Sequence, residues 1–192
     1  MNSLIKKIVK RFKRKFSSTE YWEQRYQSGG NSGSGSYNHL ADFKANFIND
    51  FITKYNVHSA VEFGCGDGNQ LSLIKYPKYH GLDVSQTSIK ICQHKFNRDS
   101  TKSFQVYNPY AFKIEGKGKH DLSLSLDVIY HLVETELFNL HMIHLFQSAS
   151  RFVIIYSTNF DESQINHERN HHFTKWVEEN EQQWELVSIK EN

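Results

Sequence analysis

Apolar residues along the chain follow two periods, one typical of helices and one typical of strands. A helix of about four turns is predicted over residues 39–55, where apolar positions recur every three or four residues. Shorter helical patterns lie at 70–75, 85–96, 134–148 and 173–180. Strand-like runs are predicted at 57–63, 79–84, 104–107, 121–127, 152–157 and 184–189. Strands and helices therefore alternate along most of the chain.

This alternation predicts an α/β fold, with a mainly parallel sheet covered on both faces by helices. The 192 residues suit one such domain, which we place at 39–192. In a sheet of this kind a ligand binds outside the carboxyl ends of the strands, where the strand order reverses. The residues that close each predicted strand are therefore the first candidates for a functional site.

Residues 1–18 are predicted to form a basic amphipathic helix, with apolar residues on one side and lysines and arginines on the other. Seven basic side chains and no acidic one fall within residues 1–16. The remainder holds 16 basic and 21 acidic side chains, so nucleic-acid binding by the main domain is not expected. Two interpretations of the basic segment stay open: binding to an anionic membrane surface, or a solvated arm or helix packed on its own domain.

Residues 19–38 combine aromatic side chains with a run of glycine and serine. Tyr21, Trp22, Arg25 and Tyr26 precede the run at 28–36, and Tyr37 follows it. Aromatic side chains of this size need a surface to pack on. We therefore favour a lid that folds over a bound ligand rather than a flexible linker.

Cysteine usage and hydropathy indicate a reduced, cytoplasmic setting, with peripheral attachment to the inner face of the membrane as one interpretation of the basic segment. The two cysteines, Cys65 and Cys92, form neither a C-x-x-C motif nor a disulfide scaffold. Cys65 lies within a glycine turn, where a small side chain packs well. The longest apolar runs are far shorter than the ~20 residues that span a bilayer.

The first predicted strand ends in Glu62 and a turn that contains Gly64, Gly66 and Gly68. Missing side chains let such a turn bring the backbone close to a ligand. The dinucleotide pattern G-x-G-x-x-G would need a glycine in place of Asn69, and no P-loop lysine follows. The turn therefore indicates a ligand without identifying it.

Polar residues also close the next three predicted strands. Asp83 stands nineteen residues after Gly64, where a carboxylate can accept hydrogen bonds from both hydroxyls of a ribose. Asn108 closes the third strand with an amide that can pair with an adenine edge, and Asp127 closes the fourth. The alternative is that Asp83 and Asn108 only open turns. We favour a nucleoside-binding site.

Residues 61–68, 81–85 and 124–132 resemble, in order, the glycine, ribose-binding and fourth motifs of class I S-adenosylmethionine-dependent methyltransferases. The resemblance implies a Rossmann-like fold and S-adenosyl-L-methionine as the cofactor, with Glu62 near its ammonium group. Residues 21–26, 28–36 and 125–134 also resemble a bacterial methyltransferase group often associated with cell-surface polysaccharide biosynthesis. The residues that we expect to bind the cofactor are Tyr21, Arg25, Glu62, Gly64, Cys65, Gly66, Asp83, Val84, Asn108 and Asp127.

The candidate catalytic residues follow the fourth predicted strand. His131 is the expected base for a hydroxyl acceptor, because an ordinary imidazole can take a proton near neutral pH. Tyr130 is expected to orient the acceptor, and Asp127 to serve either the base or the cofactor. The alternative is that His131 caps or packs the following helix.

The segment after the fifth predicted strand is expected to bind the acceptor, through His167, Arg169 and His171. Arg169 can clamp a phosphate or carboxylate. His167 and His171 would share a metal if the segment were helical, but no third ligand has a suitable spacing, so no metal is predicted. A polar, solvated loop is the alternative.

The chain also departs from the family pattern, in which the sheet ends with a hairpin of strands six and seven. Here only one strand is predicted after residue 157, and an exposed strand edge would favour a homodimer or a partner chain. The leading hypothesis is O-methylation of a sugar, polysaccharide precursor or related small molecule. A cofactor-binding subunit of low activity and an RNA-directed methyltransferase are the alternatives.

Overall fold

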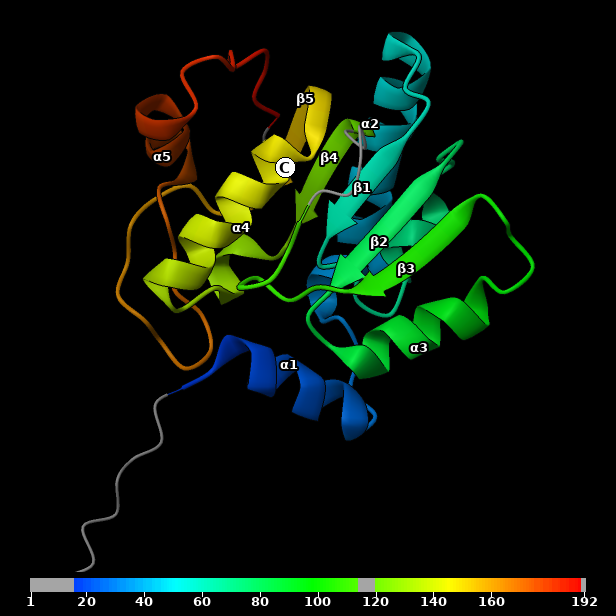
Figure 1. Ribbon diagram of the computed structural model, residues 1–192, viewed down its shortest axis with the longest axis horizontal. Coiled ribbons are helices and arrows are strands. Elements are labelled where there is room, and N and C mark those ends of the chain that lie inside the picture. The colour runs from blue at the N-terminus through cyan, green and yellow to red at the C-terminus, as the bar shows by residue number, and fades with distance from the viewer. Residues whose placement is uncertain (1–15, 114–119, 191–192) are drawn as a thin grey trace, which may run out of the picture.

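The computed structural model describes residues 16–113 and 120–190, which contain one sheet of five strands (Figure 1). The strands are β1 (Ala60–Phe63), β2 (Tyr79–Asp83), β3 (Lys102–Val106), β4 (His120–Leu126) and β5 (Ala149–Tyr156). Their order is β3-β2-β1-β4-β5, and every neighbouring pair is parallel. The predicted α/β fold with a parallel sheet is confirmed.

Helices cover both faces of this sheet (Figure 1). Ile48 and Ile89, from α2 and α3, pack in one core cluster, whereas Met142 and Leu145 of α4 pack in a second cluster with Trp176 of α5 at its margin. The helices, of which those labelled η are 3-10 helices, are α1 (Ser18–Gln27), η1 (Ser34–Ser36), α2 (Asn38–Tyr55), η2 (Gln70–Leu73), α3 (Gln86–Lys95), η3 (Ile129–His131), α4 (Thr135–Gln147) and α5 (Phe173–Asn180). Burial on both faces is the reason that the strand sequences read as apolar runs.

The strand order reverses at β1, which pairs with β2 on one side and with β4 on the other. β1 ends at the glycine turn 64–68, and β4 ends directly before Asp127. Helix α1 lies across the carboxyl ends of the strands (Figure 1). The expected ligand-binding edge is therefore covered by the segment predicted to act as a lid.

The predicted sixth strand, at 184–189, is wrong, because no strand follows β5 within residues 120–190. The side chains of Leu186, Val187 and Ile189 are 64%, 74% and 71% exposed, and no neighbouring strand pairs with them. Alternation alone does not make a strand, since backbone groups need partners. Trp184 packs against Phe146, with ring centroids 5.5 Å apart.

Two further expectations differ from the structure. The helix predicted at 70–75 is only the short 3-10 helix η2. The predicted basic helix at 1–18 falls almost entirely on residues 1–15, which lie outside the described residues, and Ser18 at its end is the first residue of α1. Among the residues that the structure describes, no helix is long and apolar enough to cross a bilayer.

Helix α1 is attached to the domain at two points. At its start, the backbone N–H of Ser18 donates to Glu134 Oε1 over 3.0 Å. Farther along, Glu23 accepts hydrogen bonds from Ser85 Oγ at 2.6 Å and from Thr87 Oγ1 at 2.8 Å. Partial burial acts to raise the pKa of Glu23, but these bonds outweigh it and lower the pKa from 4.5 to about 2. The ionised carboxylate therefore holds α1 against the start of α3.

This attachment predicts a stability that depends on pH. Because the folded-state pKa of Glu23 is depressed, its contribution is complete above about pH 4.5 and disappears as the pH falls toward about 2. The free energies of unfolding of the wild type and of Glu23→Gln should thus differ near pH 7 and converge over that range, as measured in urea. Glu179→Gln, at an exposed position on α5, is the control and should show no such convergence.

Candidate cofactor-binding and active site

The glycine turn after β1 has a backbone that only glycine accommodates well. Gly64, Gly66 and Gly68 have φ angles of 89°, 54° and 70°, in the left-handed region. A Cβ atom on Gly64 would lie 2.3 Å from Val128 Cγ2, and one on Gly66 would lie 2.2 Å from Ser32 Oγ. Glycine is therefore required here for two reasons: the φ angles are positive, and the neighbouring segments leave no room for a Cβ atom.

Asp83 fixes the other side of this turn. Its Oδ2 atom accepts the backbone N–H of Gly66 at 2.9 Å, and its Oδ1 atom accepts that of Ser85 at 2.8 Å. Burial raises the pKa of Asp83, while the two backbone hydrogen bonds act to lower it. Each carboxylate oxygen has a second lone pair, so the group can also accept hydrogen bonds from a ribose.

The glycine and serine run folds back onto the glycine turn. The backbone N–H of Ser32 donates to Asp67 Oδ2 at 3.0 Å, and Ser32 Oγ accepts the backbone N–H of Asp67 at 2.9 Å. The Tyr37 hydroxyl donates to the same carboxylate at 2.8 Å. Burial, this hydrogen bond and the nearby negative charge raise the pKa of Tyr37 to about 12. These contacts fasten residues 28–36, part of the predicted lid, to the glycine turn.

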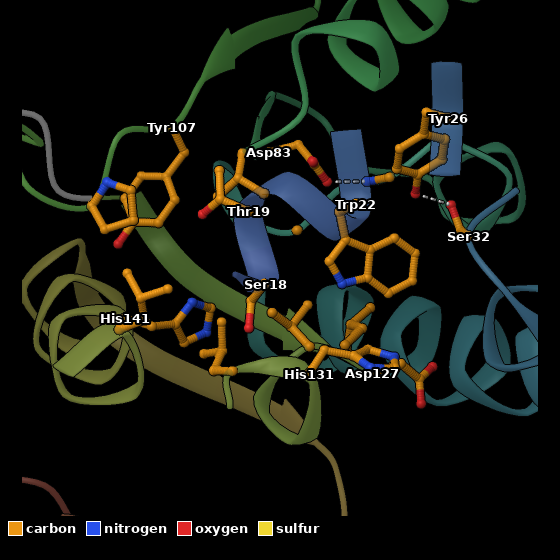
Figure 2. A pocket seen from close by; sticks show the side chains of 18 of the residues that line it. Ser18, Thr19, Trp22, Tyr26, Ser32, Asp83, Tyr107, Asp127, His131 and His141 are labelled. Atoms are coloured by element: carbon orange, nitrogen blue, oxygen red, sulfur yellow. Dashed lines mark hydrogen bonds between the residues drawn. The ribbon is translucent and has the colours of Figure 1, made fainter. Parts of the chain in front are cut away.

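A cavity, partly open to solvent, lies between the lid and the carboxyl ends of the strands (Figure 2). Trp22 and Tyr26 close it from α1, and Asp83 and His131 face it from the sheet side. Its lining residues are Ser18, Thr19, Trp22, Tyr26, Ser32, Ser36, Gly64, Gly66, Asp83, Val84, Tyr107, Pro109, Leu126, Asp127, Val128, His131, Leu132, Leu137 and His141. The cavity lies at the strand-order reversal, as the fold predicts.

The structure brings only part of the predicted cofactor set to this cavity. Gly64, Gly66, Asp83, Val84 and Asp127 line it. The residues predicted to bind the cofactor that do not line it are Tyr21, Arg25, Glu62, Cys65 and Asn108. The sequence therefore predicted where the strands end, but it did not predict which side chains near those ends line the cavity.

The side chains outside the cavity have other partners. Glu62 is buried and accepts the Tyr79 hydroxyl at 2.6 Å; burial raises its pKa to about 7. Asn108 is exposed, and its Oδ1 accepts the backbone N–H of Tyr110, so it opens a turn. The guanidinium Nε of Arg25 donates to the carbonyl of Asn31 at 2.7 Å, which steadies the lid.

Sequence reasoning missed a buried ion pair between Lys44 and Asp127. Lys44 is 2% exposed, and its ammonium also donates to the carbonyl of Gly35 at 2.9 Å. It lies on the buried side of α2 with Ala41 and Ile48. A lysine on an apolar helical stripe was the available signal, since a buried charge needs a partner.

Other residues that line the cavity were also not predicted from the sequence. His141 is buried and shares a hydrogen bond of 2.9 Å with Ser125 Oγ, and burial lowers its pKa to about 3. Tyr107 pairs through its hydroxyl with His144 Nδ1 at 2.7 Å. Trp22 was seen only as an aromatic anchor of the lid. No sequence motif distinguishes these side chains from ordinary core residues.

The predicted catalytic residues lie together beside the cavity. The Tyr130 hydroxyl donates to Asp127 Oδ1 at 3.1 Å, and the ring of His131 meets that of Trp22 edge to face at 4.8 Å. Burial lowers the pKa of His131 to about 4, although the nearby backbone of His167 acts in the opposite direction. Figure 2 shows His131 beside Trp22 at the cavity wall.

The predicted acceptor-binding residues are placed differently from one another. His167 stacks on His131 with ring centroids 5.3 Å apart. Arg169 donates to Thr135 Oγ1 at 2.9 Å, and His171 is buried against Phe138 with its Nε2 atom 2.9 Å from the Leu132 carbonyl. None of the three lines the cavity. Arg169 and His171 thus attach this segment to the start of α4, and only His167 is close to the candidate base.

The comparisons agree with this geometry. Residues 61–154 match a family described as "Methyltransferase domain". Magnesium protoporphyrin IX methyltransferase from Synechocystis PCC 6803, solved with bound S-adenosylmethionine, is 16% identical with a TM-score of 0.61, covering 87% of each chain. The methyltransferase domain of bacterial CtHen1 is 17% identical with a TM-score of 0.60, covering 76% of this chain and 85% of that one.

A third match is the N-methyltransferase NodS from Bradyrhizobium japonicum, solved with S-adenosylhomocysteine. It is 13% identical with a TM-score of 0.56, covering 70% of this chain and 69% of the other. Across the structures compared, this chain spans from 35% to 87% of the matched chain's length. No curated protein matches the sequence.

The chain has the fold of class I S-adenosylmethionine-dependent methyltransferases, and its residues 61–154, which contain the glycine turn, match the family described as "Methyltransferase domain". Its cofactor is S-adenosyl-L-methionine, and the cavity fits this molecule. The backbone at Gly64 and Gly66 is open where a Cβ would clash, and Asp83 presents buried carboxylate oxygens for a ribose. Apolar side chains from Val84, Pro109 and their neighbours offer a surface for a flat base.

Proposed function

We propose that the enzyme O-methylates a sugar, a polysaccharide precursor or a related small molecule. The observation that carries this proposal is the position of His131, which lines the same cavity as Gly64 and Asp83. A group that can accept a proton therefore stands beside the space that the cofactor fits. An alcohol needs such a group, because its proton must leave as the methyl group arrives.

The charges around the cavity favour a neutral acceptor. Asp127 is already paired with Lys44 and Tyr130, and Asp83 accepts two backbone hydrogen bonds. A protonated amine would need a carboxylate of its own to offset the loss of water. A hydroxyl has no such need and can be held by neutral donors and acceptors.

Aromatic side chains of α1 support a sugar as the acceptor. Trp22 lines the cavity, and the rings of Tyr21 and Tyr26 lie within 6 Å of its ring, at 5.5 and 5.9 Å. Flat rings of this kind offer an amphipathic surface for a molecule that has both C–H and O–H groups. One structural match, 16% identical with a TM-score of 0.53, is an amino pentose methyltransferase from Micromonospora echinaspora.

The chemical step follows from this arrangement. When bound, S-adenosylmethionine supplies the methyl group: its C–S bond breaks as the acceptor oxygen forms the new C–O bond, and S-adenosylhomocysteine remains. His131 receives the hydroxyl proton. Trp22 and the lid exclude water, and Tyr130 is positioned through Asp127. We also propose a cytoplasmic enzyme and, of the two interpretations of the basic segment, the one in which residues 1–16 bind an anionic membrane surface where lipid-linked acceptors reside.

The test is turnover with defined acceptors. S-adenosylhomocysteine release should be stimulated by free or nucleotide-linked sugars and not by their fully O-methylated forms. His131→Gln should lower kcat by about 100-fold or more, which is the usual contribution of proton transfer, while S-adenosylhomocysteine affinity changes by less than about threefold. His172→Gln, at an exposed histidine in the neighbouring segment, is the matched control. Turnover of amines alone, or an unchanged kcat in His131→Gln, would contradict the proposal.

A further inference from the structure

Three metal-ligating side chains meet at the rim of the cavity. They are His131 at the end of η3 and the consecutive residues His167 and Glu168 from the segment between β5 and α5. One ligand atom from each lies within 4.8 Å of the other two. The His167 Nε2 and Glu168 Oε1 atoms are 3.6 Å apart. From the sequence, His167 was paired with His171 and no third ligand was found, whereas the structure places His167 beside Glu168 and beside His131, which is distant along the chain.

Backbone hydrogen bonds hold the two segments together. The N–H of Arg169 donates to the carbonyl of Tyr130 at 2.7 Å, directly beside both groups of ligands. Ile165 and Glu168 exchange two backbone hydrogen bonds, at 2.8 and 3.0 Å, which close a tight turn around His167. The cluster is thus built on fixed backbone and is not a chance meeting of long surface side chains.

One of the three side chains, His131, has a ring nitrogen that forms no hydrogen bond within the protein. The Nδ1 atom of His131 is buried and has no hydrogen-bond partner in the structure. A buried polar atom without a partner is costly, and such exceptions in native proteins usually have a functional reason. Glu168, by contrast, is exposed, so its carboxylate can move toward an ion at little cost.

We propose that His131, His167 and Glu168 bind a divalent transition-metal ion of the zinc type. Two imidazoles and one carboxylate suit zinc, iron, cobalt or manganese, whereas calcium and magnesium prefer oxygen ligands alone. Three protein ligands leave a coordination position open, and one of the three, His131, also lines the cavity.

The rings of His131 and His167 are stacked, at an interplanar angle of 11°, so binding requires His167 to rotate out of the stack. The metal-binding inference does not depend on the acceptor. Its catalytic consequence does rest on the proposed function: an ion at this place would lower the pKa of the acceptor hydroxyl, whose proton would pass to water, and His131 would act as a ligand in place of a base.

The experiment uses the full chain without an affinity tag, treated with a chelator and then titrated with cobalt(II) in the absence of acceptor. We expect one ion per chain and the visible absorption of a site with nitrogen ligands. His167→Ala and Glu168→Gln should each weaken binding by at least about 10-fold, since even outer-shell changes have effects of this size. His172→Ala is the matched control and should bind as the wild type does.

Thermal unfolding of each chelator-treated variant separates loss of the site from loss of the fold. S-adenosylhomocysteine affinity, measured on the same samples, should be unchanged in Glu168→Gln, because this exposed side chain does not line the cofactor cavity. Absence of cobalt binding, or binding that all three variants retain, would overturn the inference. Neither result would affect the proposed O-methylation, which is measured separately by sugar-dependent turnover.

Discussion

Replacing Asp83 with alanine is expected to weaken the binding of S-adenosylhomocysteine by about 100-fold or more. Two hydrogen bonds from ribose hydroxyls to a charged acceptor contribute ~1.5–3 kcal/mol each, and every ~1.4 kcal/mol is tenfold in affinity. The variant also loses the acceptor that holds the backbone N–H of Gly66 at 2.9 Å, so the glycine turn loosens. Isothermal titration with S-adenosylhomocysteine measures the combined effect.

Asp83→Asn separates the two contributions. It keeps the size of the side chain and one acceptor oxygen, but its NH2 group faces a backbone N–H of Gly66 or Ser85. Its affinity should fall between those of the wild type and Asp83→Ala, with a similar melting temperature to the alanine variant. Retention of wild-type affinity in Asp83→Ala would show that the ribose is held elsewhere.

The positions of the strand ends were predictable because they depend on local patterns. The spacing from Gly64 to Asp83 reflects one crossover and one strand, β2, and parallel strands bring their carboxyl ends to the same edge. The turn itself was predictable because few other residues tolerate positive φ angles at such positions. These parts of the site follow from chain geometry.

Side-chain direction was less predictable. Glu62 and Asn108 stand at the correct strand ends, but Glu62 is turned toward Tyr79 and Asn108 toward its own turn. Successive residues of a strand point to opposite faces, so a shift of one position moves a side chain out of the cavity. Tyr107, one residue before Asn108, is the side chain that lines it.

The contacts of the lid needed the tertiary structure. The aromatic residues of 19–38 predicted that this segment packs against the domain, and the structure shows Asp67 as the partner of Ser32 and Tyr37.

The prediction of a sixth strand was wrong for a related reason. Residues 184–189 are mostly apolar, but pairing depends on a neighbouring edge that the sequence does not specify.

Breaking the buried ion pair between Lys44 and Asp127 is expected to have a second large effect, on the free energy of unfolding. Lys44→Met should lower the free energy of unfolding by about 3–5 kcal/mol, because it leaves the Asp127 carboxylate largely buried without its cation. The carbonyl of Gly35 in the lid loses a donor as well. Urea unfolding measures the change, and Lys102→Met, which removes a lysine from the more exposed pair with Asp99, is the control with a smaller effect.

The double variant Lys44→Met/Asp127→Asn tests whether the uncompensated charge is the cause. Neutralising Asp127 removes the buried charge that the single variant leaves behind, so the double variant should recover about half or more of the lost stability. A double variant no more stable than Lys44→Met would instead attribute the loss to packing of the lysine side chain against Tyr156, whose ring lies 4.9 Å from the ammonium.

The same two variants also test the role of Lys44 in holding the lid. The hydrogen bond from Lys44 to the Gly35 carbonyl is missing from both, so cofactor affinity should be reduced in both, even where the double variant regains stability.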